Sequence, residues 1–184
     1  MKVIGYGTGR CGTQSLASFL NQQPDLIVTH EKVNLGWFPI FDDDYATIGN
    51  FINSEVTGDI SYEWLNYAGY VLSKYNVKAI NIIRDDEEVI ESFYTYKSYL
   101  YDYASFMENE WFGHPYHSDK PTKDAIAQMV KYYRYWEKQL KNSYKDRIYI
   151  IETCDLNDKT KLNDLLDWIG VTDKNLTACH TNKR

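Results

Sequence analysis

The sequence predicts an α/β fold in which a central, mostly parallel β-sheet lies between two layers of helices. Short apolar runs alternate along the chain with longer segments whose apolar residues recur every three or four positions. The run Val77–Ile83 (VKAINII) is largely apolar on both of its alternating faces, which is typical of a buried parallel strand. We therefore expect a three-layer sandwich with right-handed crossovers, whose ligands bind at the carboxyl ends of the strands.

The N-terminal part of the chain supplies three of the expected strands and two of the helices. Apolar runs that end in glycine or polar residues predict the strands, and Pro24 closes the first helical pattern. In chain order these elements are a strand at Met1–Tyr6, a helix from Thr13 to Asn21–Pro24, strands at Leu26–Thr29 and Glu55–Ser61, and a helix at Tyr62–Tyr75. The stretch from Val33 to Asn53 has no decisive pattern, and its acidic run Asp42–Asp44 is interpreted as a solvated loop rather than a cation site.

The second part of the chain continues the alternation. A stripe from Ile126 to Leu140, with apolar residues three or four positions apart, predicts a long helix that packs on the core. Gly170 follows the last periodic residue and is suited to end a helix. The expected elements after Val77–Ile83 are helices at Asp86–Tyr101 and around the stripe, a strand at Arg147–Glu152 and a helix at Lys159–Ile169.

Length and composition bound the protein's class. A chain of 184 residues is expected to form one domain, residues 1–184, with a core that needs no disulfides. The net charge of -6 argues against general binding to nucleic acids or anionic membranes, because both need a broad basic surface. Three cysteines without close spacing predict neither a disulfide framework nor a zinc cluster, and we find no export signal or apolar span. A cytoplasmic protein is expected.

A glycine-rich loop, Gly7–Ser15 (GTGRCGTQS), follows the first strand and precedes a helix. Glycines allow the backbone to turn its amides inward, and the helix adds its positive N-terminal end, so the loop is suited to bind phosphate or sulfate. Gly7 and Gly12 are spaced as the two glycines of a P-loop, but Thr13 replaces its Lys and Gln14 its magnesium-binding hydroxyl. Arg10 offers a charged alternative to the Lys. Cys11 is a less favoured candidate as a nucleophile.

A second polar group follows the strand Val77–Ile83. Arg84 ends that strand, and Ser92 lies two helical turns later. Because Arg84 is expected at the same sheet edge as the loop, the pair can bind a second phosphate at some distance from the first. The alternative interpretation is an Arg84 that pairs with Asp85 and Asp86, with Ser92 on an ordinary helix surface.

Together the two motifs resemble those of the sulfotransferases that use 3′-phosphoadenosine 5′-phosphosulfate (PAPS). GTGRCGTQSL is similar to the family's 5′-phosphosulfate loop, and Ile82–Tyr94 (IIRDDEEVIESFY) to its 3′-phosphate motif, although Asp86 stands where the family usually has Pro. Ile148–Val171 is similar to a strand, acidic turn and helix found late in these enzymes. The resemblance implies a P-loop NTPase-like sulfotransferase fold and a PAPS cofactor, released as the desulfated nucleotide PAP.

The resemblance also implies the roles of individual residues. Glu31, in the segment Thr29–Lys32 after the second strand, would be the catalytic base, with His30 as second choice. Arg10 would stabilise the charge that develops on the leaving phosphate oxygen. The 5′-phosphosulfate would be held by Gly9, Arg10, Cys11, Gly12, Thr13, Gln14 and Ser15, and the 3′-phosphate by Arg84 and Ser92.

The expected reaction is sulfuryl transfer to a hydroxyl of a small molecule or carbohydrate, without a metal. Aromatic segments at Gly36–Tyr45 and Tyr94–Phe112 are candidates to contact the acceptor, whose identity the sequence leaves open together with the oligomeric state. His114 and His117 are separated by a proline and fit a loop better than a metal site, and His180–Arg184 fits either a nucleotide contact or a basic tail. Alternatives are a P-loop nucleotide kinase with an altered loop and a non-catalytic nucleotide-binding module.

Overall fold

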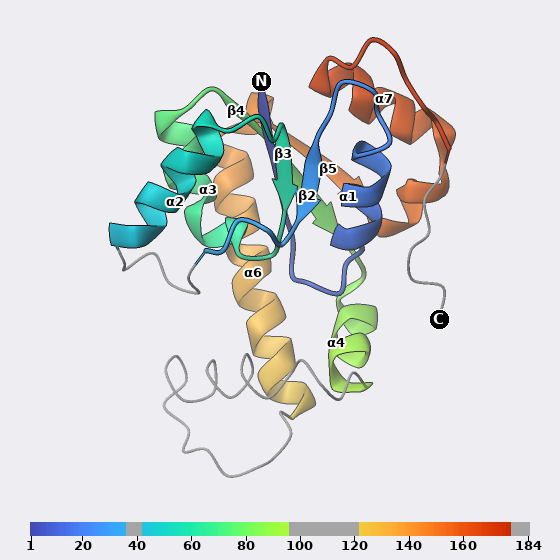
Figure 1. The fold of residues 1–184 in the computed structure, drawn as a ribbon. Helices are drawn as coiled ribbons and strands as arrows, with labels where there is room; N and C mark the ends of the chain where they lie inside the picture. Colours follow the sequence, from blue (N-terminus) through green and yellow to red (C-terminus); the bar gives the residue numbers. More distant parts are fainter. Residues whose placement is uncertain (36–41, 96–121, 178–184) are drawn as a thin grey trace.

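A computed structural model describes residues 1–35, 42–95 and 122–177 of the chain (Figure 1). Its centre is a sheet of five strands in the order β2-β3-β1-β4-β5, and every pairing between neighbours is parallel. The strands are β1 (Lys2–Tyr6), β2 (Val28–His30), β3 (Gly58–Ile60), β4 (Val77–Ile83) and β5 (Ile148–Glu152). This confirms the expected α/β architecture with a parallel sheet.

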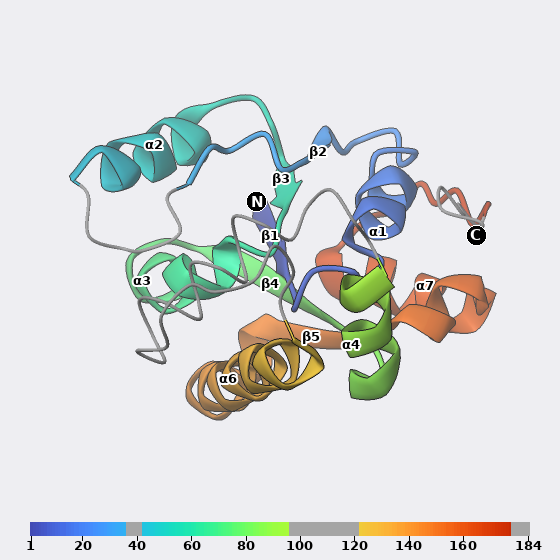
Figure 2. The ribbon, with the colours of Figure 1, turned by 90° about the horizontal axis from the view of Figure 1, so that it is seen from below.

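Helices cover both faces of this sheet, as Figure 2 shows, with α1 and α7 on one side and α3 and α6 on the other. Each side has its own apolar cluster, one centred on Trp64 and Tyr67 and the other on Phe19 and Leu166. The helices are α1 (Thr13–Leu20), α2 (Asp42–Asn53), α3 (Trp64–Lys74), α4 (Asp86–Thr95), α6 (Lys123–Ser143) and α7 (Lys159–Ile169), with short 3-10 helices η2 (Lys145–Arg147) and η3 (Thr153–Asn157). Within the described ranges no helix has the length and apolar character needed to cross a membrane.

Most elements lie where the sequence predicts them, but two strands are shorter. The second strand was expected from Leu26, whereas β2 begins at Val28. The Ile27 N–H donates to the Thr57 hydroxyl, and the Ile27 carbonyl accepts from the backbone N–H groups of Thr57 and Gly58. β3 covers only Gly58–Ile60 of the expected Glu55–Ser61. The helix expected from Asp86 is confirmed as far as Thr95, and the remainder of its expected range lies outside the described residues.

The helix α2 is an element that the sequence did not reveal. The segment that contains the acidic run was interpreted as a loop, and this was wrong because the run begins α2. Ile48 and Phe51 are buried against the apolar cluster on the α3 side, and Phe51 contacts the ring of Trp64. These two residues are one helical turn apart, so a short amphipathic face anchors the helix.

Arg147 fixes the point where α3 turns into β4. Its guanidinium donates hydrogen bonds to the carbonyl oxygens of Leu72 at 2.6 Å, Tyr75 at 2.6 Å and Val77 at 2.7 Å. The Tyr75 carbonyl also accepts from the backbone N–H of Val77 at 3.0 Å, and the planar guanidinium supplies donors to all three carbonyls of this turn. Arg147 directly precedes β5 and thereby also ties this strand to β4.

Replacing Arg147 by Met should therefore destabilise the fold without altering the site described below. We expect a loss of about 2–3 kcal/mol in the free energy of unfolding, because charge-assisted hydrogen bonds to partly buried carbonyls are lost. Urea denaturation measures this loss. The exposed Lys145 in the same turn gives a control variant, Lys145→Met, which should change stability by less than about 0.5 kcal/mol. Equal stability of the two variants would contradict the assigned role.

Candidate functional site

The loop between β1 and α1 has a backbone conformation that its glycines make possible. Gly9, Arg10 and Gly12 have φ values of 75°, 54° and 92°, so the chain passes three times through the left-handed region. Gly7 lies so close to β4 that a Cβ atom there would stand 2.4 Å from the carbonyl oxygen of Ile82. The result is a tight turn packed on the sheet edge that leads directly into the first turn of α1, the geometry of an anion-binding loop.

Arg84 and Ser92 lie beside this loop, at the same sheet edge, as the sequence predicts. The Nε atom of Arg10 donates a hydrogen bond to Oγ of Ser92 at 3.2 Å, and Nη1 of Arg84 donates to the carbonyl oxygen of Arg10 at 3.1 Å. Arg84 also forms an ion pair with Glu88, 2.7 Å from Nε. The structure thus joins the two sequence motifs through three polar side chains, two of which are arginines.

His30 and Glu31 approach the same loop from the end of β2. Nε2 of His30 is 3.1 Å from Oγ1 of Thr13, the first residue of α1, and 3.6 Å from Oε1 of Glu31. Both side chains are a little more than one quarter exposed, so they are accessible to a ligand. Glu31 has a φ of 53°, which is uncommon for a residue with a side chain and marks a tightly held turn.

Asp59 holds that turn in place, and the sequence analysis missed it. This carboxylate at the centre of β3 is fully buried and accepts hydrogen bonds from the backbone N–H of Lys32 and the hydroxyl of Thr29, on either side of His30 and Glu31. Its other oxygen accepts from Nε1 of Trp64 at 3.0 Å. A buried carboxylate with several donors is well satisfied, so Asp59 positions the segment that carries the candidate base.

Glu63 is a second acidic residue of this region that the sequence analysis missed. It directly precedes α3, and its carboxylate accepts a hydrogen bond from Oγ of Ser61, which follows β3. Burial, with smaller contributions from the charges of Glu31 and Asp59, raises the pKa of Glu63 to about 7. The only sequence signal for a polar site here was a serine two positions before a glutamate at the end of a strand. An ordinary short turn explains such a pair equally well.

The structure argues against Cys11 as a nucleophile. Its side chain is completely buried beneath the loop, and burial raises the pKa of the thiol to about 11, with the charge of Glu137 acting in the same direction. At neutral pH the sulfur therefore remains protonated, whereas nucleophilic attack requires the thiolate. Cys11 contributes to the loop through its backbone and to the core through its side chain.

Other predicted features fall partly or wholly outside the described residues. This applies to His114, His117 and His180–Arg184, and to most of the aromatic segments Gly36–Tyr45 and Tyr94–Phe112. In the part of the chain that the structure describes, no three His, Cys, Asp or Glu side chains gather as metal ligands would. The described site therefore consists of the loop, the Arg84 and Ser92 pair, and the acidic residues beside β2 and β3.

Comparison with known proteins yields matches at the level of structure alone. The chain matches no protein-family model, and no curated protein is similar to it in sequence. A crystal structure of a sulfotransferase from Alicyclobacillus acidocaldarius superposes with a TM-score of 0.63 at 15% identity, covering 97% of this chain and 85% of that one. The chain has the sulfotransferase fold. This confirms the fold that the two motifs predicted.

A second solved structure with this fold is mouse sulfotransferase SULT7A1 in complex with PAP. It superposes with a TM-score of 0.56 at 15% identity over 95% of this chain. Our chain spans 60% of the length of the mouse protein, so a large part of that enzyme has no counterpart here.

The raised pKa of Glu63 predicts a stability that depends on pH. Between pH of about 4.5, where an unfolded Glu ionises, and about 7, the native protein binds more protons at this site than the unfolded chain. Its contribution to the free energy of unfolding therefore falls as pH rises through this range. Glu63→Gln should gain stability relative to wild type between pH 5 and pH 8.

Urea denaturation of wild type and Glu63→Gln at pH 5 and pH 8 measures how the difference in their free energies of unfolding changes with pH. The exposed Glu87 on α4 provides the control, because Glu87→Gln should follow wild type at both pH values. A Glu63→Gln variant whose difference from wild type is the same at pH 5 and pH 8 would rule out the raised pKa.

Proposed function

We propose that the protein transfers a sulfuryl group from PAPS to a hydroxyl of a small-molecule or carbohydrate acceptor. The observation that carries this proposal is the contact between Arg10 and Ser92, with Arg84 bonded to the carbonyl of Arg10. A glycine loop alone serves many nucleotide-binding proteins, but this loop joins directly to a second Arg and hydroxyl pair. Two adjacent anion sites suit a nucleotide with phosphate groups on both its 3′ and 5′ sides.

The residues present fit such a nucleotide. The absence of a side chain at Gly7 lets the loop lie against β4, and its turn and the start of α1 offer backbone donors and a favourable dipole. We assign the 5′ end of PAPS to this loop, where Cys11 contributes only its backbone because its side chain is buried. The 5′-phosphosulfate is held by Gly9, Arg10, Cys11, Gly12, Thr13, Gln14 and Ser15. When bound, PAPS supplies the sulfuryl group.

Arg84 and Ser92 hold the 3′-phosphate. Arg84 now pairs with Glu88, whose side chain is 60% exposed. An exposed ion pair of this kind contributes little free energy, so a phosphate with a higher charge displaces Glu88 from the guanidinium at small cost. The arrangement therefore agrees with a site in which Glu88 keeps Arg84 oriented until the nucleotide binds.

In this proposal Glu31 removes the proton from the acceptor hydroxyl. Its carboxylate lies beside His30, which contacts Thr13 in the loop, so the base is near the 5′ end of the nucleotide. Arg10, the loop amides and the α1 dipole stabilise the negative charge on the departing phosphate oxygen. His30 and Glu63 are the alternative bases. A pKa of about 7 leaves Glu63 half protonated near neutral pH, which makes it the second candidate.

A nucleotide kinase is the weaker interpretation. Thr13 stands where a kinase loop has Lys, and its hydroxyl contacts His30. The loop thus lacks the usual clamp for β- and γ-phosphates, and Gln14 replaces the hydroxyl that binds magnesium.

We further propose that residues 1–184 act as one domain. We also propose a cytoplasmic location, since Cys11 and Cys154, the cysteines among the described residues, are free thiols.

Binding of PAP tests the two-phosphate assignment. Arg84→Ala should weaken PAP binding roughly 10-fold to 100-fold, the usual effect of losing a charge-assisted contact with phosphate. Glu88→Gln removes the competing carboxylate and should leave binding unchanged or tighter. Isothermal titration calorimetry measures both. Adenosine 5′-phosphate is the control ligand, because without a 3′-phosphate it should bind wild type and Arg84→Ala equally. Equal PAP affinity in these two proteins would sink the assignment.

Sulfuryl transfer tests the base. Glu31→Gln should bind PAP as wild type does, yet lose transfer to hydroxyl acceptors by roughly 10²–10⁴-fold, the contribution of a general base. Glu63→Gln, the matched carboxylate variant, should retain most of the activity. The opposite pattern would assign the base to Glu63. Wild type that binds PAP but transfers sulfate to no phenol, sugar or alcohol in a broad screen would instead indicate a non-catalytic binding module.

A further inference from the structure

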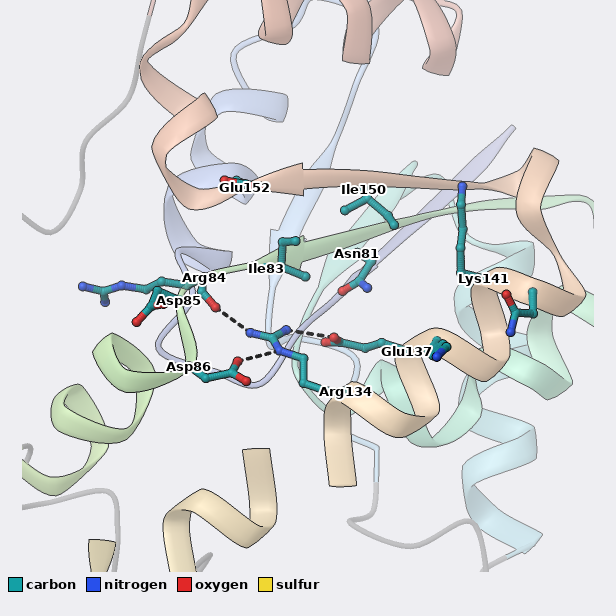
Figure 3. Close-up of a pocket in the computed structure, with 12 residues that line it drawn as sticks. Asn81, Ile83, Arg84, Asp85, Asp86, Arg134, Glu137, Lys141, Ile150 and Glu152 are labelled. Atoms are coloured by element: carbon teal, nitrogen blue, oxygen red, sulfur yellow. Dashed lines mark hydrogen bonds and ion pairs between the residues drawn. The ribbon is translucent and has the colours of Figure 1, made fainter. Parts of the chain in front are cut away.

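A groove lies on the other side of the corner between β4 and α4, away from the anion loop (Figure 3). Its volume is about 650 Å³, and it runs between α6 and the adjoining strands β4 and β5. α6 leaves the face of β5 partly uncovered, so that Ile150 is 43% exposed. The corner separates the groove from the proposed nucleotide site: the Arg84 side chain extends away from the groove, while its carbonyl oxygen accepts from Nη2 of Arg134 at 2.6 Å.

Two buried side chains in the wall of this groove have oxygens without partners. Glu137 of α6 is only 4% exposed, and its Oε2 accepts from Nη1 of Arg134 at 2.8 Å. Its Oε1 has no hydrogen-bond partner among the described residues, and the same holds for Oδ1 of Asn81 on β4, which is 3% exposed. Both side chains project toward each other across the groove in Figure 3. Leaving a buried acceptor unpaired costs free energy, so this pair calls for a donor.

The local charge favours a cationic donor over a neutral one. Arg134 serves two carboxylates at once, because its Nε pairs with Asp86 at 2.8 Å while Nη1 pairs with Glu137. One positive charge between two negative charges leaves this cluster with a net charge of -1. Burial raises the pKa of Glu137, while Arg134 and the side chain of Asn81 act in the opposite direction. At the two unpartnered oxygens a bare metal ion fits poorly, since this position offers it one carboxylate and one amide oxygen next to a guanidinium.

The other residues that line the groove favour a ligand with an apolar chain. Ile83 and Ile150 place apolar side chains on the sheet side of the groove, beside Asn81. Lys141 donates to the carbonyls of Lys145 and Ile148, so its amine is already engaged by the backbone. We propose that the groove binds a small primary alkylammonium compound, with its ammonium on Glu137 Oε1 and Asn81 Oδ1 and its chain along Ile83 and Ile150. Binding in the groove does not require the proposed sulfuryl transfer.

A matched pair of probes tests the proposal on the whole chain. n-Butylamine, protonated at neutral pH, and 1-butanol have the same chain and differ in the head group. In ¹⁵N-resolved NMR titrations, n-butylamine should produce saturable shifts at Asn81, Ile83, Ile150 and residues 134–141, while 1-butanol should bind at least about tenfold more weakly. Equal binding of the two probes would overturn the proposal, because the groove would then recognise only the alkyl chain.

Two variants test separately the residue proposed to bind the ammonium group and the surface proposed to contact the alkyl chain. Glu137→Gln should weaken n-butylamine binding at least about tenfold, whereas Glu87→Gln, an exposed carboxylate change on α4, should not alter it. Should Glu137→Gln fold poorly, Ile150→Trp fills the groove from an exposed position and should abolish the shifts. The proposal fails if n-butylamine gives no saturable shifts in wild type, which is the result expected if water alone satisfies the two oxygens. It also fails if n-butylamine binds Glu137→Gln and Ile150→Trp as tightly as wild type.

Discussion

The close approach of the Gly7–Ser15 loop to β4 is the constraint on which the site depends. No side chain fits at Gly7, where a Cβ would meet the Ile82 carbonyl oxygen, and Gly12 allows only narrow space beside Thr153. The Thr153 hydroxyl donates to the carbonyls of Cys11 and Ile83, so η3 fastens the loop to the end of β4. With the loop held there, the first turn of α1 faces the edge at which the parallel strands end.

This position of the loop accounts for the contacts of its neighbours. Once Arg10 is turned toward α4 by its left-handed backbone, it meets Ser92, and the carbonyl of Arg10 is available to Arg84. On the other flank, Thr13 meets His30 because β2 ends beside α1. Residues from four separate elements thus converge through the geometry of one loop. A parallel sheet brings these residues together, because the carboxyl ends of all its strands lie at one edge.

Sequence patterns predicted the parts of the fold in which local preference and packing agree. Val77–Ile83 has a strand pattern and is a central strand, and Gly170 ends α7 with a φ of 98°, as a helix-ending glycine should. α2 escaped prediction because an acidic run hid an apolar face of few residues. Glu63 and Asp59 escaped for another reason. A carboxylate's burial depends on which strands become neighbours, and no local pattern encodes that.

The corner between β4 and α4 links the two polar sites of the molecule. On one side Arg84 contacts the loop, and on the other its carbonyl binds Arg134, which also pairs with Asp86 and Glu137. A proline, which the resembling motif of the PAPS-dependent sulfotransferases usually has at this position, could not supply that ion pair. The ion pair between Asp86 and Arg134 ties the first residue of α4 to α6. Arg134 thus holds the backbone at Arg84, so the proposed nucleotide site and the groove share one structural support.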